Sequence, residues 1–190
     1  MSAKQLYIDF DQYIRQGEPS QKEKAYIWST AIGLQAVDGL TTSEYLQKTA
    51  QRNIEGEISI DEANVLVHNY YITKTSHDDD ADVEEADRVE ANIAKLLSAN
   101  SFSFSVFGLT QIHRNIFDGV FKFAGKIRDY NITKKEWVLR GDTVTYMYAS
   151  DLRLALEYYA QHTKTRMALC PRLNILNDSF AICFWVSSGC

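Results

Sequence analysis

The stretch IHRNIFDGVFKFAGKIRDYNITK, residues Ile112–Lys134, decides how this chain is expected to fold. A helical pattern that begins near Val106 ends near Phe117, in the first part of the stretch. Beyond Gly125 the pattern changes, and residue types that are typical of strands become frequent. The stretch therefore marks a change from helix to strand within a chain whose other segments mostly read as helices.

Two strand-like segments follow that change. Asn131–Val138 and Thr143–Tyr148 are rich in Thr, Ile, Val, Tyr and Trp, and Arg140-Gly141-Asp142 stands between them. Two such runs joined by a short segment that contains glycine are typical of a β-hairpin. We therefore expect one small hairpin in a chain that is mainly α.

Upstream of the stretch, three start signals predict three helices. Each signal is a Ser or Thr followed three residues later by Glu, so that hydroxyl and carboxylate can satisfy the N–H groups at a helix start. The pattern occurs at Ser20–Glu23, Thr41–Glu44 and Ser59–Glu62. Gly39 and Gly56 follow the first two helices and are expected to end them, because glycine tolerates positive φ at a C-cap. The three predicted helices reach to about residues 37, 55 and 72.

Two further helices are expected, at Val83–Ala99 and from about Ser150 onward. The acidic run His77–Asp82 precedes the first of them. Clustered carboxylates suit hard cations, but the same residues also suit a solvated loop whose acids favour the start of the next helix. We prefer the loop. The residues expected to face the core are Ile27, Trp28, Ala31, Leu34, Val89, Ile93, Leu96 and Leu97.

Composition limits the possible classes of protein. The chain has 190 residues, of which 45% are hydrophobic and 24% charged, which suits one compact core rather than a disordered chain. A net charge of -5 argues against a nucleic-acid partner. No signal peptide and no apolar run of about 18 residues is found, so we expect a cytoplasmic protein with no membrane partner. Cys170, Cys183 and Cys190 match no common zinc pattern, and we expect neither metal ligands nor disulfides among them.

The stretch Ile112–Lys134 resembles the opening signature of the Fic (Fido) domain, which has the form I-H-R-x-(L/I)-F, then (Y/F)-x-(W/F)-A-G-x-I-R, then N-I-(S/T)-K. Several rare identities occur here in order and at the right spacing. The matching residues to which we give a structural role are His113, Arg114, Phe117, Ala124, Gly125 and Arg128. We interpret His113 as a buried, hydrogen-bonded histidine, because the catalytic histidine of the family belongs to a later loop.

In Fic proteins the residues after this signature form a β-hairpin flap. The flap holds an extended segment of a target protein by adding a strand to it. The resemblance therefore implies a protein partner that docks on the predicted hairpin. The candidate docking residues are Asn131, Ile132, Thr133, Lys134, Lys135, Glu136, Trp137 and Val138.

A second match lies upstream, at Glu55-Gly56. It is similar to the motif (S/T)-x-x-x-E-(G/N) in the inhibitory helix of Fic proteins that carry their own brake. In that family the glutamate pairs with an arginine of the catalytic loop and blocks productive placement of the ATP γ-phosphate. Gln51 stands here at the Ser/Thr position. The alternative interpretation of Glu55 is an ordinary surface acid beside a C-cap glycine.

The Fic family transfers AMP from ATP onto Ser, Thr or Tyr hydroxyls of a target, and its chemistry lies in a loop of the form H-P-F-x-x-G-N-G-R. That loop supplies the general base, the phosphate-binding turn and the arginine, and it meets Mg²⁺ and the ATP phosphates. No such loop occurs in the 190 residues. We therefore name no catalytic and no metal-ligating residue, we expect the Fic core to be C-terminally incomplete, and we expect binding of ATP and Mg²⁺ to be impaired.

The resulting hypothesis divides the chain into three parts: an N-terminal helical region at 1–100 with an inhibitory-like helix, a partial Fic domain at 101–160, and an atypical tail at 161–190. The tail is either out of frame or natural. By resemblance the chain is an AMP-transferase that lacks its catalytic loop. The alternative is a non-catalytic module that binds targets or restrains an intact Fic paralogue in trans, as an antitoxin does; homo-oligomers are possible in both cases. A helical scaffold with no nucleotide role is a third alternative.

Overall fold

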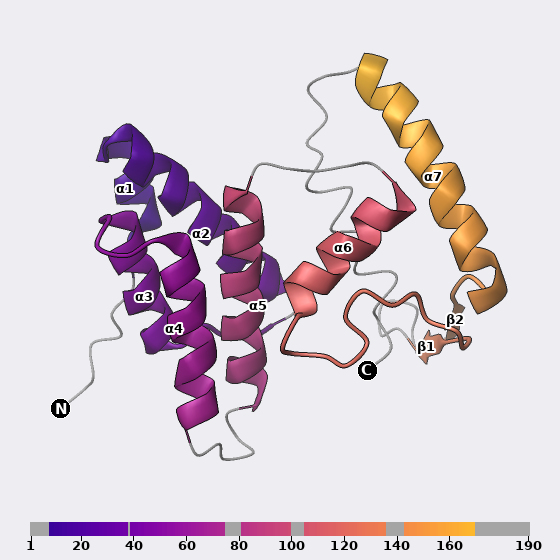
Figure 1. Ribbon diagram of the computed structural model, residues 1–190, viewed down its shortest axis with the longest axis horizontal. Helices are drawn as coiled ribbons and strands as arrows, with labels where there is room; N and C mark the ends of the chain where they lie inside the picture. The colour runs from indigo at the N-terminus through magenta and orange to yellow at the C-terminus, as the bar shows by residue number, and fades with distance from the viewer. Residues whose placement is uncertain (1–7, 38, 75–80, 100–104, 136–142, 170–190) are drawn as a thin grey trace. The chain divides into compact units, whose positions relative to one another are not determined.

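The protein is mainly helical, as the sequence predicts. The computed structural model describes residues 8–37, 39–74, 81–99, 105–135 and 143–169, coloured in Figure 1. The chain divides into two compact units. The first comprises Met1–Asn100 with Asn115–Lys122, and the second comprises Ser101–Arg114 with Phe123–Cys190. The middle of the stretch Ile112–Lys134, residues Asn115–Lys122, thus belongs to the first unit.

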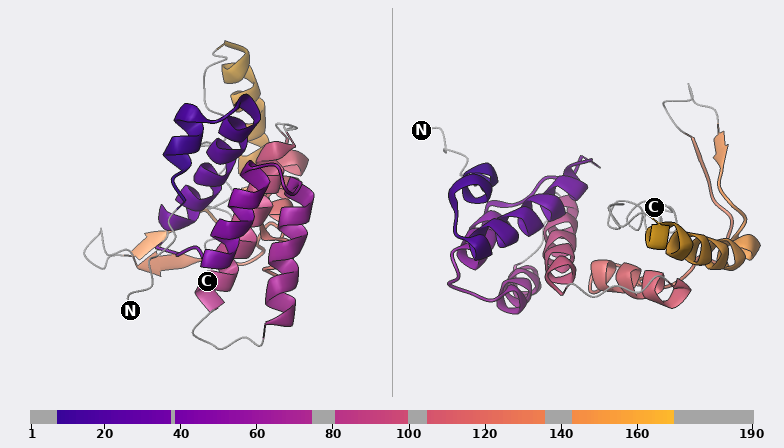
Figure 2. Two further views of the ribbon diagram at one scale, coloured as in Figure 1. Left: turned by 90° about the vertical axis from the view of Figure 1, so that its left-hand side faces the viewer. Right: turned by 90° about the horizontal axis from the view of Figure 1, so that it is seen from above.

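The first unit contains five helices among its described residues, α1 to α5. Helix α2 packs against α1, α3 and α5, and α4 packs against α3 and α5 (Figures 1 and 2). Their bounds are Phe10–Gln16 for α1, Pro19–Val37 for α2, Glu44–Ile54 for α3, Ile60–Thr73 for α4 and Ala81–Ser98 for α5.

Glycine ends two of these helices. Gly39 has a φ of +79°, and the N–H groups of Gly39 and Leu40 donate to the carbonyls of Ala36 and Gln35. Gly56 has a φ of +84° and closes α3 in the same way. These paired bonds form the Schellman motif, which satisfies the last carbonyls of a helix. Both predicted C-caps are confirmed.

The predicted helix starts are confirmed at one of three positions. Ser59 and Glu62 form the expected capping box at the start of α4. Helix α3 has Ser43 rather than Thr41 as its N-cap. The box predicted at Ser20 is wrong, because α2 begins one residue earlier at Pro19, whose ring fixes a helical φ.

The core of the first unit lies between α2, α3, α4 and α5. Trp28 is fully buried, and alanines on α2 and α5 let those helices approach each other closely. Of the predicted core residues, Ile27, Trp28, Ala31, Val89 and Ile93 are buried, whereas Leu34, Leu96 and Leu97 are half-buried. The fully buried large side chains include Trp28, Leu46, Ile54, Val67, Val89 and Ile93.

The second unit contains α6, Val106–Phe117, up to Arg114, together with two strands and α7, Ala149–Leu169. Strand β1, Thr133–Lys135, pairs antiparallel with β2, Thr143–Thr145. Both strands lie within the segments that the sequence marks as strand-like. The candidate docking residues Glu136, Trp137 and Val138 lie outside the described residues.

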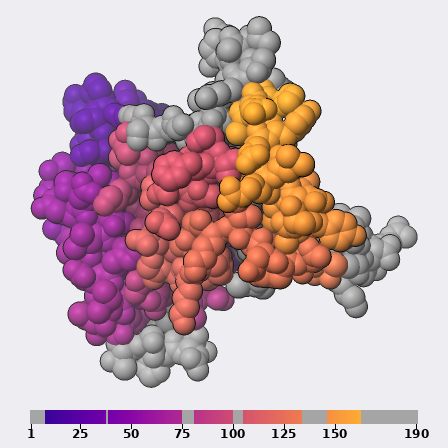
Figure 3. Space-filling model, turned by 45° about the vertical axis from the view of Figure 1, so that its right-hand side comes forward, coloured from indigo at the N-terminus to yellow at the C-terminus, as the bar shows by residue number. Residues whose placement is uncertain are grey.

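Helix α7 continues to Leu169, so the boundary predicted at residue 161 falls inside a helix. Residues 170–190 are outside the described part of the chain. Leu152 and Leu156 are buried, whereas Leu154, Tyr158 and Tyr159 are exposed. Figure 3 shows the surface of α7 in yellow and orange. The buried pair is spaced by four residues, as expected for one face of a helix.

Candidate functional site

The turn that follows α3 carries Glu55, the candidate inhibitory residue of the sequence prediction. Glu55 is the C-cap of α3 and has helical backbone angles. The N–H groups of Gly56 and Glu57 donate to the carbonyls of Asn53 and Arg52. The backbone of this turn is therefore fully tied to the end of the helix, and Glu55 is exposed upon it.

A buried asparagine supports the turn from below. Asn53 Oδ1 accepts a hydrogen bond from Trp28 Nε1 at 3.1 Å, and Asn53 Nδ2 donates to the Ile58 carbonyl at 2.9 Å. Lys24 Nζ donates to the Asn53 carbonyl at 2.9 Å, where a cation suits the C-terminus of α3. Through Asn53, these bonds connect α2 to the residues on both sides of the turn. Contacts with the buried core therefore fix the position of the turn.

Two side chains hold the Glu55 carboxylate. Tyr13 Oη donates to Glu55 Oε1 at 2.7 Å, and Gln51 Nε2 donates to the same oxygen at 2.9 Å. The bond from Tyr13, and then the bond from Gln51, lowers the pKa of Glu55 below its ordinary value. Gln51 thus supplies a donor to the glutamate that lies one helical turn later in the sequence.

In the second unit, the histidine of the signature is buried. His113 Nδ1 accepts a hydrogen bond from the Gly125 N–H at 2.8 Å, and burial lowers the His113 pKa. An accepting Nδ1 places the proton of a neutral ring on Nε2. The expectation of a buried, hydrogen-bonded His113 agrees with this geometry.

Glycine is required at position 125. Gly125 has a φ of +75°, and a Cβ there would stand 2.8 Å from Arg114 Cβ and 3.3 Å from the Thr110 carbonyl oxygen. Both the backbone angle and the close approach exclude other residues. His113 and Gly125 thereby fix the chain that leads from α6 toward the strands.

Arg128, the last arginine of the signature-like stretch, contacts the chain on both sides of the strand pair. Arg128 donates to the Tyr130 carbonyl, just before β1, and to the Met147 carbonyl, just after β2. Asn131 Oδ1 accepts from the Ala149 N–H at 2.8 Å, at the start of α7. One guanidinium and one amide thus hold together the segments that enter and leave the strand pair.

Replacing Arg128 with alanine is expected to weaken the strand pair by about 1–3 kcal/mol, because two carbonyls lose a charged donor. Hydrogen exchange of residues 133–135 and 143–145 measures the effect. Arg153→Ala, on the exposed face of α7, is the matched control. Equal exchange rates in both variants would show that Arg128 does not hold the strands.

The remaining candidate residues are dispersed. Phe117 contacts Phe121, with ring centroids 5.5 Å apart, in the first unit. Arg114 is exposed and Ala124 is half-buried. Among the flap residues, Asn131 and Thr133 are exposed and Ile132 is half-buried, and β1 contains Lys134 and Lys135.

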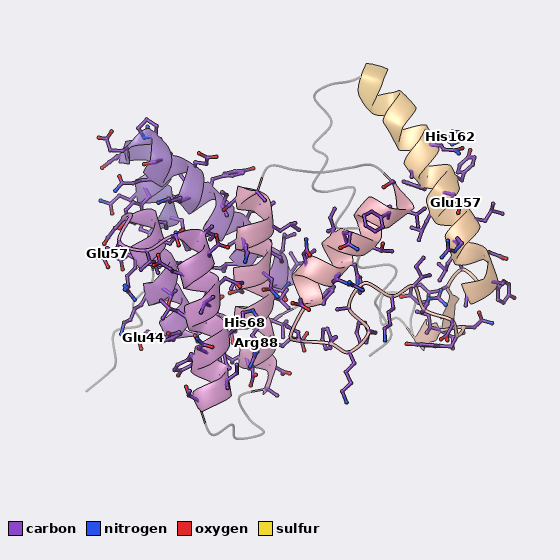
Figure 4. All side chains as sticks on the ribbon, in the orientation of Figure 1. Glu44, Glu57, His68, Arg88, Glu157 and His162 are labelled. Atoms are coloured by element: carbon purple, nitrogen blue, oxygen red, sulfur yellow. The ribbon has the colours of Figure 1, made fainter. Side chains whose placement is uncertain are left out.

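The first unit contains a polar network that the sequence analysis does not predict. Asn92 Nδ2 donates to the carbonyls of Ile116 and Asp118, and His68 Nε2 lies 3.0 Å from Asn92 Oδ1. Arg88 joins His68 Nδ1 to Glu84, and Figure 4 shows Arg88 on α5 beside His68 on α4. Since arginine only donates, His68 accepts at Nδ1 and donates at Nε2. The network ties the end of α6 to α4 and α5.

Within the described ranges, no group of three or more His, Cys, Asp or Glu is arranged to hold a metal ion. The helices of the same ranges are all too short or too polar to span a membrane. The chain matches no family model, no curated protein and no solved structure.

Proposed function

We propose that this chain has a Fic-type framework, in which the strand pair docks an extended segment of a protein target. In the Fic family this framework serves the transfer of AMP from ATP to Ser, Thr or Tyr hydroxyls. The observation that carries the proposal is the contact of Arg128 with the Tyr130 and Met147 carbonyls on the two sides of the strand pair, together with the His113–Gly125 hydrogen bond that fixes the chain leading to it. Of the residues that resemble the signature, Arg128 holds the segments that flank the strands.

The strand pair has the geometry that β-augmentation needs. Thr133 lies opposite Thr145 and Lys135 lies opposite Thr143, and each strand pairs only with the other among the described residues. The outer edge of such a pair offers unpaired N–H and C=O groups, which an extended peptide can meet. This supports docking of a target strand rather than of a globular surface.

The 190 residues lack the loop that catalyses AMP transfer in the Fic family. They contain no H-P-F-x-x-G-N-G-R sequence and no Gly-Asn-Gly turn for phosphates. The residues present do not fit an ATP–Mg²⁺ site, so we assign no step of the transfer to them. We expect no AMP transfer from these residues alone.

A second candidate function is regulation in trans. Its supporting observation is the Glu55 turn, in which an exposed carboxylate is held by two donors on a turn fixed from the core. A rigidly presented acid suits an arginine on an intact Fic paralogue. In this alternative the chain acts on that enzyme as an antitoxin does.

A chimera tests the framework. A segment that carries H-P-F-x-x-G-N-G-R is joined after α7, and AMP transfer is followed with α-labelled ATP, Mg²⁺ and a cell lysate. We expect no labelling by the 190-residue chain and labelling by the chimera. We further expect Glu55→Gln to increase labelling by the chimera, because the amide cannot neutralise the loop arginine as a carboxylate does.

Glu57→Gln is the matched control, because Glu57 lies on the same turn and pairs with Arg52 instead. A chimera that folds by circular dichroism but neither binds ATP nor labels protein would contradict the framework. Labelling by the 190-residue chain itself would show that another base replaces the family histidine. Inhibition of an intact Fic enzyme by the 190-residue chain, lost in Glu55→Gln, would favour the second function.

A further inference from the structure

Helix α1 is attached to the surface of the first unit. None of its residues is buried, and Ile8, just before it, is the nearest buried side chain. Gly17 ends the helix at a tight corner, where a Cβ would lie 2.6 Å from the Tyr13 carbonyl oxygen and 3.2 Å from Gln21 Cβ. This corner lets α1 fold back and pack against α2.

One side chain of α1 reaches Glu55 on the turn that follows α3. The Tyr13 hydroxyl donates to Glu55 Oε1 across 42 residues of sequence, at 2.7 Å. The bond from Gln51 to the same oxygen comes from within α3 and needs no other helix. Tyr13 is therefore the group that makes the direction of the Glu55 carboxylate depend on α1.

We propose that Tyr13 is a positioning residue for Glu55, so that α1 and the turn after α3 form one regulatory element. This inference rests on the proposed function, in which Glu55 restrains a catalytic arginine.

The chemistry of the contact explains how it would act. A hydroxyl that donates to an ionised carboxylate makes a charge-assisted hydrogen bond, which limits the rotamers of both side chains. Without Tyr13, Gln51 alone holds Glu55, and the carboxylate reaches an arginine in fewer of its conformations. Restraint therefore weakens when Tyr13 is withdrawn.

The contact is also easily released. A short surface helix with no buried residue opens at low free-energy cost compared with the core. A phosphoryl group on the Tyr13 oxygen would remove the donor and place negative charge beside Glu55, so it would repel the carboxylate. Movement of α1 or modification of Tyr13 would thus loosen the restraint without any change in α3.

The first test uses the 190-residue chain and the pKa of Glu55, measured by NMR titration of its side-chain carboxyl carbon. Tyr13→Phe is expected to raise that pKa toward the ordinary 4.5, because the hydrogen bond from Tyr13 is the largest cause of its lowering. Tyr26→Phe, which alters an exposed tyrosine on α2, is the control and should leave it unchanged. An unchanged Glu55 pKa in folded Tyr13→Phe would overturn the inference.

The second test uses the chimera that carries the catalytic loop. Tyr13→Phe is expected to raise AMP transfer by about 2- to 10-fold, less than Glu55→Gln does, and to add nothing in the Glu55→Gln background. Equal transfer with and without Tyr13 would overturn the positioning role even if the pKa moves. If Glu55→Gln itself leaves transfer unchanged, the proposed brake fails, and the pKa then reports separately whether Tyr13 holds Glu55.

Discussion

Glu90→Gln is expected to stabilise the first unit by about 3–5 kcal/mol near pH 9 and to change its stability little near pH 5. Glu90 is a fully buried residue of α5. Its pKa is raised to about 8, mainly because burial disfavours the charged form; a hydrogen bond from Thr42 lowers the pKa and the charge of Asp87 raises it. Its Oε2 is buried and meets no donor in the part of the chain that the structure describes.

The direction with pH follows from where the proton resides. Between the ordinary 4.5 and about 8, the folded protein keeps a proton on Glu90 that the unfolded chain has released. Stability therefore falls as pH rises through this window, because folding then requires proton uptake. Glutamine does not titrate, so the variant does not lose this stability as pH rises. Asp87 and Tyr71 are the other titratable groups in this cluster.

Urea denaturation near pH 5, 7 and 9 measures the effect. Glu23→Gln, an exposed acid on α2, is the matched control and should leave the pH dependence unchanged. A difference between Glu90→Gln and the wild type that is the same at all three pH values would contradict the prediction.

The acid beside Glu90 has a different environment. Asp87 accepts hydrogen bonds from the Ser43 N–H at 2.9 Å, from the Ser43 hydroxyl and from the Tyr71 hydroxyl at 2.6 Å. These bonds fix the N-cap of α3 against α4 and α5. They also explain why Ser43, rather than Thr41, caps α3, since a partner 44 residues away selects it.

Features that depend on a few neighbouring residues could be predicted from the sequence. The Schellman glycines Gly39 and Gly56, the Ser59–Glu62 box and the bounds of α6 all follow from contacts within about one helical turn. The predicted start of α2 at Ser20 is wrong. The side chain of Gln21, rather than that of Glu23, accepts a hydrogen bond at the helix start, from the Glu18 N–H.

The candidate site could be predicted only in part. The sequence indicated Glu55, His113 and Gly125, because a motif names residues directly. It could not indicate Tyr13 or the contact of Trp28 with Asn53, because these pairs are 42 and 25 residues apart and no local pattern joins them. Docking of a target on the strands stays a prediction.

Trp28→Ala is expected to cost the first unit about 3–5 kcal/mol, a large part of the 5–15 kcal/mol that is typical of a domain. Trp28 is fully buried on α2, and no other fully buried side chain among the described residues is as large. Truncation leaves a cavity whose lining loses its packing contacts. It also removes the indole N–H that Asn53 Oδ1 accepts.

Trp28→Phe separates these two contributions. Phenylalanine keeps most of the volume but has no donor, so we expect a smaller cost of about 1–2 kcal/mol. Tyr26→Ala, an exposed aromatic two residues away, is the control for loss of an aromatic ring on α2. Denaturant unfolding measures all three, and equal stabilities of Trp28→Ala and Tyr26→Ala would contradict the central place of Trp28 in the core.

Trp28→Phe and Tyr26→Ala also test whether the core supports the turn that follows α3. In Trp28→Phe the fold persists, but Asn53 loses the donor that orients its amide, and Asn53 Nδ2 is the group that holds the Ile58 carbonyl beyond Glu55. We therefore expect faster hydrogen exchange at Gly56 and Glu57 in Trp28→Phe than in Tyr26→Ala, which leaves the bond to Asn53 in place. Unchanged exchange there would show that the Schellman bonds alone hold the turn, with the core adding nothing to the placement of Glu55.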